Sequence, residues 1–125
     1  MNSADQPEAD VVVALTGDEK EDARVVFGAL RTAFACDRAA DDVPQAAAVG
    51  RPTVWIATFN VSEVRAEPRP ARLRAPVAVT LQGGYTAVDS LRKSLASAFT
   101  VRMVGTASGD QEEEVQLRLE NRENR

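Results

Sequence analysis

The sequence predicts an α+β fold of the ferredoxin-like type, a β-α-β-β-α-β two-layer sandwich with an added C-terminal strand that forms a hairpin. Three observations predict it: short runs rich in β-branched residues, two amphipathic stretches at helical spacing, and two alternating runs at the end joined by a turn cluster. With 125 residues, 44% hydrophobic and 27% charged, the chain is expected to form one globular domain over 10–121. Disordered tails are expected at 1–9 and 122–125.

The first half of the chain predicts a strand, a helix and a loop. The strand is expected at Asp10–Gly17, where "DVVVALTG" is a valine-rich run closed by glycine. Apolar residues of 18–36 then recur at i, i+3, i+4 and i+7 behind a cluster of acids, which predicts a helix. The stretch 37–52 has no period and contains two prolines, so a long surface loop is expected there.

The second half predicts three more strands and a helix after the strand at 53–61. In that strand, "TVWIATFNV", alternation places Trp55 and Phe59 on one face and Val54 and Ile56 on the other. A proline-punctuated connection leads to a strand in "APVAVTL", and apolar spacing over 87–99 predicts a second helix. The runs "TVRMVGT" and "EEVQLRLEN", joined by "ASGDQ", predict a closing hairpin.

Gly83 and Gly84 stand where a strand gives way to a helix, and two interpretations stay open. Thr86 lies three residues before Asp89, an arrangement that caps helices, and the glycines would then supply a tight turn. The free backbone amides at the N-terminus of a helix also bind anions, so an anion site is the second interpretation. No dinucleotide-binding or P-loop motif accompanies the glycines, so the turn is the preferred interpretation.

Charge is distributed unevenly along the chain, whose formal net charge is -4. Acids concentrate near both ends, while "RPARLR" in the middle carries Arg69, Arg72 and Arg74 without an intervening acid. A solvated loop is the preferred interpretation, and contact with an acidic protein partner is the alternative. Nucleic acid is disfavoured, because the chain is acidic and its single Trp and Tyr do not interleave with the arginines.

The residue inventory excludes the commonest catalytic chemistry. The chain has no histidine, which removes Ser-His and Cys-His nucleophile activation and ordinary catalytic zinc sites. Its acidic pairs lack calcium-loop spacing, and a lone Cys36 leaves no internal disulfide. We therefore expect no metal, no cofactor and no enzymatic activity. Without a secretory pattern or a long apolar run, a cytoplasmic protein with no membrane contact is expected; its arginine-rich, lysine-poor composition indicates a high-GC bacterial genome.

A binding role remains, and an apolar patch indicates where. Val54 and Ile56 are expected to point away from the helices, beside Val12, Ala14 and Val104, and such a patch marks a contact surface. A second copy is the simplest partner, although the loop after Cys36 could cover the patch instead. We expect a small non-enzymatic bacterial accessory or adaptor domain that acts through protein-protein association as a homodimer. The alternative is a regulatory domain that senses a small anion near Gly83 and Gly84.

Overall fold

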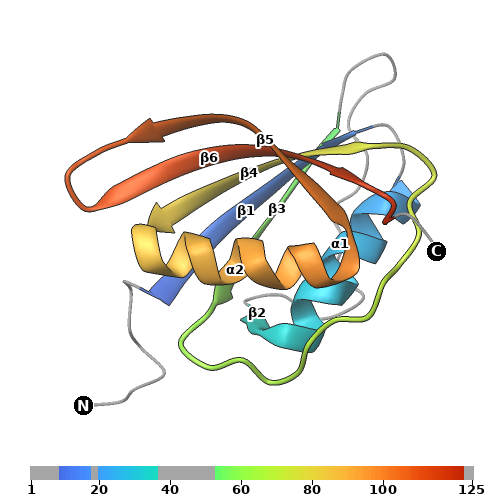
Figure 1. Ribbon diagram of the computed structural model, residues 1–125, viewed down its shortest axis with the longest axis horizontal. Coiled ribbons are helices and arrows are strands. Elements are labelled where there is room, and N and C mark those ends of the chain that lie inside the picture. Colours follow the sequence, from blue (N-terminus) through green and yellow to red (C-terminus); the bar gives the residue numbers. More distant parts are fainter. Residues whose placement is uncertain (1–8, 18–19, 37–52, 123–125) are drawn as a thin grey trace.

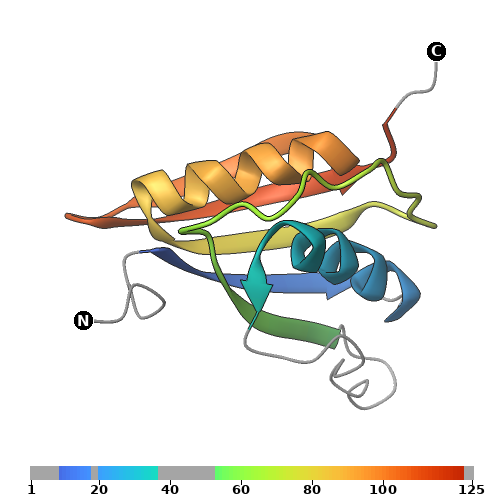
Figure 2. The same cartoon turned by 90° about the horizontal axis from the view of Figure 1, so that it is seen from below.

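The computed structural model describes residues 9–17, 20–36 and 53–122, which form two layers. Figure 1 shows a twisted sheet as one layer and both helices as the other, and Figure 2 looks onto the helices with the sheet behind them. The elements are β1 (Asp10–Gly17), α1 (Lys20–Ala33), β2 (Ala35–Cys36), β3 (Thr53–Asn60), β4 (Val77–Gly84), α2 (Tyr85–Ala98), β5 (Thr100–Ser108) and β6 (Glu112–Glu120).

The ferredoxin-like prediction is wrong, because the strands lie in the order β2-β3-β1-β4-β6-β5 and all neighbours are antiparallel. In the predicted fold two split β-α-β units interlock, each inserting a strand into the other. Here the gap in each β-α-β unit is occupied by the strand that follows that unit in the chain: β3 lies between β1 and β2, and β6 lies between β4 and β5. The final strand is therefore interior instead of extending an edge.

The two-residue strand β2 is the physical reason for this difference. After α1 the chain runs parallel to β1 only over Ala35–Cys36, and β3 then returns antiparallel between them. The second half repeats the pattern, since α2 leads into β5 and β6 returns between β5 and β4. The two halves thus share a β-α-β-β topology, and they meet where β1 pairs antiparallel with β4.

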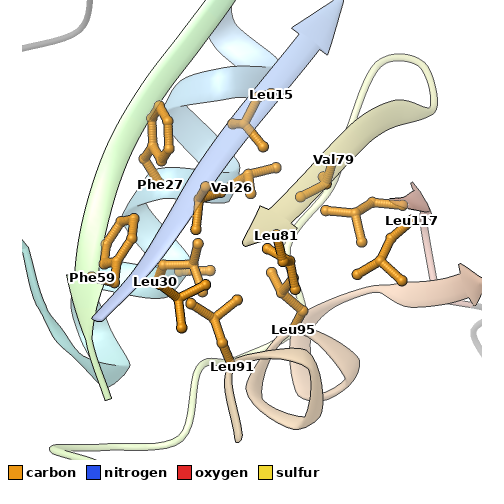
Figure 3. Close-up of a cluster of buried hydrophobic side chains, with 14 of the residues drawn as sticks. Leu15, Val26, Phe27, Leu30, Phe59, Val79, Leu81, Leu91, Leu95 and Leu117 are labelled. Carbon is orange, nitrogen blue, oxygen red and sulfur yellow. The ribbon is translucent and has the colours of Figure 1, made fainter. Parts of the chain in front are cut away.

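The core lies between the two layers, as Figure 3 shows. Both helices turn one apolar stripe toward the sheet, and Phe27 of α1 meets Phe59 of β3 with ring centroids 6.0 Å apart. The alternation predicted for β3 is confirmed: Trp55 and Phe59 are buried, whereas Val54 and Ile56 are 49% and 46% exposed. The largest fully buried side chains are Trp55, Phe27, Phe34, Phe59, Phe99, Leu15, Leu30, Leu81, Leu91, Leu95, Leu117 and Leu119.

The connection 61–76 crosses the helix layer between α1 and α2 (Figure 2). The Arg65 amide donates to the Ala33 carbonyl over 2.7 Å at the end of α1, and the Ala71 amide donates to the Ala98 carbonyl over 3.3 Å at the end of α2. Leu73, near the far end of the connection, is buried in the core. This connection therefore joins β3 to the parallel strand β4 without a helix of its own.

Asp22 and Asn121 fasten the last part of this connection. Asp22 is only 3% exposed, and its two carboxylate oxygens accept the amides of Arg74 and Ala75 over 2.8 and 3.2 Å. The Asn121 side chain accepts the Leu73 amide over 2.6 Å and donates to the Leu73 carbonyl over 2.9 Å. The segment is thus anchored through its backbone atoms.

The expected loop at 37–52 and most of both expected tails lie outside the described residues. Two tail residues are described. Ala9 is 8% exposed and its carbonyl accepts the Val61 amide over 2.8 Å, and Arg122 donates from Nη1 to the Ser97 carbonyl over 2.9 Å.

Candidate protein-association surface

One face of the sheet has no described helix or strand packed against it, and we call it the open face. Because Cα partners in neighbouring strands point their side chains to the same side, the strand registers define its members. They include Val12, Ala14 and Thr16 of β1; Val54, Ile56 and Thr58 of β3; Ala78, Thr80 and Gln82 of β4; Glu112, Glu114, Gln116, Arg118 and Glu120 of β6; and Arg102 and Ala107 of β5.

The half of the open face over β3 and β1 is apolar and exposed. Ala14 pairs with Ile56, and Val12 and Val54 stand one row to either side. Val12, Val54 and Ile56 remain 37%, 49% and 46% exposed, although all three belong to strands whose other face is core. Large aliphatic side chains that stand together in water usually mark a contact surface.

The structure brings four of the five predicted interface residues together and separates the fifth. Val12, Ala14, Val54 and Ile56 are neighbours, whereas Val104 lies on the edge strand β5, with β4 and β6 between it and β1. Val104 is 64% exposed, beside an irregularity in register between Met103 and Gly105. The face continues across β4 through residues that sequence reasoning missed, Ala78 and Thr80. Alternation with the buried Val77, Val79 and Leu81 was the signal that could have found them.

A hollow of about 440 Å³ lies on the open face between β4 and β6. Ala78, Thr80, Gln116 and Arg118 line it, and Val104 borders it from β5. Small side chains on β4 beside longer ones on β6 leave this depression, so the open face is not flat.

The other half of the open face, over β6 and β5, is charged. Glu120 accepts a bond from Arg102 Nε over 2.9 Å and lies 3.3 Å from Arg118 Nε. Arg102 and Arg118 are Cα partners, so this carboxylate offsets the repulsion between two guanidinium groups placed opposite each other. The open face therefore changes from apolar to charged across the strand order.

The three arginines of "RPARLR" lie away from the open face, in the connection along the helix layer. Arg69, Arg72 and Arg74 are exposed. Arg69 borders a second hollow of about 540 Å³ between α1 and residues 66–71. The contact of these arginines with an acidic partner stays a prediction.

Replacing all three arginines with serine is expected to lower the free energy of unfolding by no more than about 1 kcal/mol. The side chains are exposed, and the segment is held through the backbone of Leu73, Arg74 and Ala75, which the substitutions preserve. Urea denaturation of the triple variant checks this. A loss of several kcal/mol would show that the guanidinium groups themselves hold the segment.

Gly83 and Gly84 are part of β4, so the predicted glycine turn before the helix is wrong. Gly84 is the N-cap of α2 with extended backbone angles of -65° and 155°, and the helix begins directly at Tyr85. The capping role predicted for Thr86 is also wrong, since the helix begins at Tyr85 and Thr86 lies inside its first turn, while the N-cap is Gly84. Asp89 pairs forward with Arg92 and Lys93, and these hydrogen bonds lower the pKa of its carboxyl.

The residues predicted to contact an anion or an acidic partner fall into two groups at opposite ends of α2. Gly83, Gly84 and Thr86 lie at its start, whereas the arginine segment passes its end, where Ala71 bonds to Ala98. Fourteen residues of helix separate these points by roughly 20 Å. The two groups therefore do not converge on one ligand.

The described ranges contain neither a metal-ligand cluster nor a membrane-spanning helix. In residues 9–17, 20–36 and 53–122, no three acidic or thiol side chains gather in a metal-binding arrangement. Within the same ranges neither helix has the length and apolar character that a membrane crossing requires. Comparison with protein-family models, curated proteins and solved structures gave no match to this chain.

Proposed function

We propose that this protein is a non-enzymatic cytoplasmic association module that forms a homodimer through the open face. The observation that carries the proposal is the exposure of Val12, Val54 and Ile56 close together on the neighbouring strands β1 and β3. The single cysteine, which leaves no internal disulfide, supports a reducing compartment.

The size of the open face supports a second copy as the occupant. Eight-residue strands are roughly 26 Å long, and five long strands span roughly 24 Å, which gives a projected area of roughly 600 Å² per protomer. Two copies face to face would cover roughly 1,200 Å², which reaches the lower end of stable protein interfaces. Two-fold pairing also lets each apolar half meet an identical apolar half.

Ile56→Glu is expected to convert the dimer to a monomer without unfolding it. Ile56 is 46% exposed in the protomer, so glutamate can be solvated there, but burial against a partner would leave the carboxylate without water. We expect the dissociation constant to rise by at least about a hundredfold, which corresponds to about 3 kcal/mol. Sedimentation equilibrium measures the change, and circular dichroism reports the fold.

Val64→Glu is the matched control for this experiment. Val64 is 58% exposed and lies in the connection along the helix layer, so the same charge is added outside the open face. The control should keep the mass of the wild-type protein. A wild-type monomer at high micromolar concentration, or equal dissociation by both variants, would contradict the proposed dimer.

A further inference from the structure

Charges on the open face are segregated along the strands. On β6, Glu112 and Glu114 occupy one end of this face, and Arg118 lies toward the other end, with Gln116 between Glu114 and Arg118. At the arginine end, Arg102 and Arg118 both contact the Glu120 carboxylate. The open face thus has an acidic end and an arginine end.

The strand registers place a neutral row midway between the two ends. Ile56, Ala14, Thr80 and Gln116 are consecutive partners across β3, β1, β4 and β6. Glu114 and Arg118 each stand two residues from Gln116, or roughly 7 Å along β6 in opposite directions. A half-turn about this row therefore exchanges the positions of Glu114 and Arg118.

We infer that the two-fold axis of the dimer runs along this neutral row, so that the partner's strands lie reversed over those of the first protomer. The inference rests on the proposed dimer and specifies its geometry. This axis places the apolar strands β3 and β1 on their own counterparts, Ile56 near the partner's Ile56. It also places Glu114 opposite the partner's Arg118, and by symmetry this ion pair occurs twice.

A two-fold axis in the plane of the open face but parallel to the strands would match neither the apolar strands nor the opposite charges. It would exchange the two edges of the sheet and lay the apolar strand β3 over the charged strands β6 and β5. Such an arrangement removes Arg102 and Arg118 from water without a carboxylate of the partner opposite them. The hollow beside Arg118, about 440 Å³, also offers room for the partner's Glu114 when the strands are reversed.

Exchange of charge between the two ends tests this geometry. Arg118→Glu alone and Glu114→Arg alone each place like charges opposite each other twice in a homodimer, so each variant is expected to dimerise more weakly, on the order of tenfold. An equimolar mixture of the two variants is expected to form heterodimers at close to the wild-type affinity, because both contacts then join opposite charges. Native mass spectrometry distinguishes the three dimers by mass.

The mixture separates pairing between protomers from effects within one protomer. An Arg118→Glu protomer lacks the Arg118–Glu120 bridge whether it is a monomer, in a homodimer or in a heterodimer, so this loss does not favour any pairing. Only contacts across the interface favour mixed pairs. Glu113→Arg is the control, because Glu113 pairs with Gly83 on the opposite face of the sheet. Mixed with Arg118→Glu, it should not favour heterodimers.

The outcomes distinguish this geometry from the proposed function. A wild-type dimer whose charge variants mix statistically would overturn the reversed-strand geometry while leaving the dimer intact. A wild-type monomer would overturn both. Enrichment of heterodimers that falls as salt is raised is the expected result.

Discussion

Asp22→Ala is expected to lower the free energy of unfolding by about 3 kcal/mol. Asp22 is 3% exposed, and its carboxylate accepts the amides of Arg74 and Ala75 across the boundary between α1 and the connection 61–76. Hydrogen bonds to a charged group contribute more than neutral ones, and removal of Asp22 takes the acceptor away from two amides whose hydrogen bonds are partly buried. Urea denaturation at fixed protein concentration measures the loss.

Glu21→Ala provides the matched control, since Glu21 is the exposed neighbour of Asp22 in the first turn of α1. Its removal should change stability by no more than about 0.5 kcal/mol. Hydrogen exchange adds a local measurement: the amides of Arg74 and Ala75 should lose protection in Asp22→Ala before the strands do. An Asp22→Ala variant as stable as Glu21→Ala would show that the anchor contributes little.

Periodicity predicted where the elements lie but not how they connect. The buried stripe of α1 and the alternation of β3 follow directly from residue spacing, because a helix and a strand each bury one face. The strand order depended on β2, whose two residues have no detectable period. Since β2 decides that β3 returns beside β1, missing it gave the wrong sheet.

The open face was predictable in part, because alternation along a strand shows which residues share a face. Val54 and Ile56 alternate with Trp55 and Ala57, so their exposure was visible in the sequence. The neighbours of this pair depend on register between segments distant in the chain, and Val104 was therefore placed too near them. The charge arrangement along β6 also required the register, because only the pairing with β5 brings Arg102 beside Arg118 and Glu120.

Asp22 shows a second limit of local reasoning. An acid in the first turn of a helix is expected from the helix dipole alone, so its presence indicated nothing further. Its partners are 52 and 53 residues away, and only the path of the connection 61–76 brings them within reach. Side chains that fasten two distant segments thus look ordinary in the sequence.

Gly83→Ala is expected to destabilise the protein by about 2 kcal/mol, although alanine is a modest change in most strands. A Cβ at this position would lie 2.7 Å from the carbonyl oxygen of Asp10, a backbone atom of β1 next to Val11, the residue that pairs with Gly83. The strands must therefore shift apart at Val11 and Gly83, which weakens the joint between the two β-α-β-β halves. In a turn with open surroundings the same substitution would cost little, so the measurement tests whether Gly83 is a strand residue.

Two other glycines provide controls with different expected results. At Gly105 an added Cβ meets only the Gln116 Oε1 atom at 3.7 Å, so Gly105→Ala should change stability by no more than about 0.5 kcal/mol. At Gly28, within α1, nothing lies within 4 Å, and Gly28→Ala should stabilise the protein by about 1 kcal/mol because alanine favours the helix. Thermal and urea unfolding of the three variants should rank Gly28→Ala above Gly105→Ala and Gly83→Ala last. If Gly83→Ala has the same free energy of unfolding as Gly105→Ala, the close approach of β4 to the Asp10 carbonyl does not constrain this position.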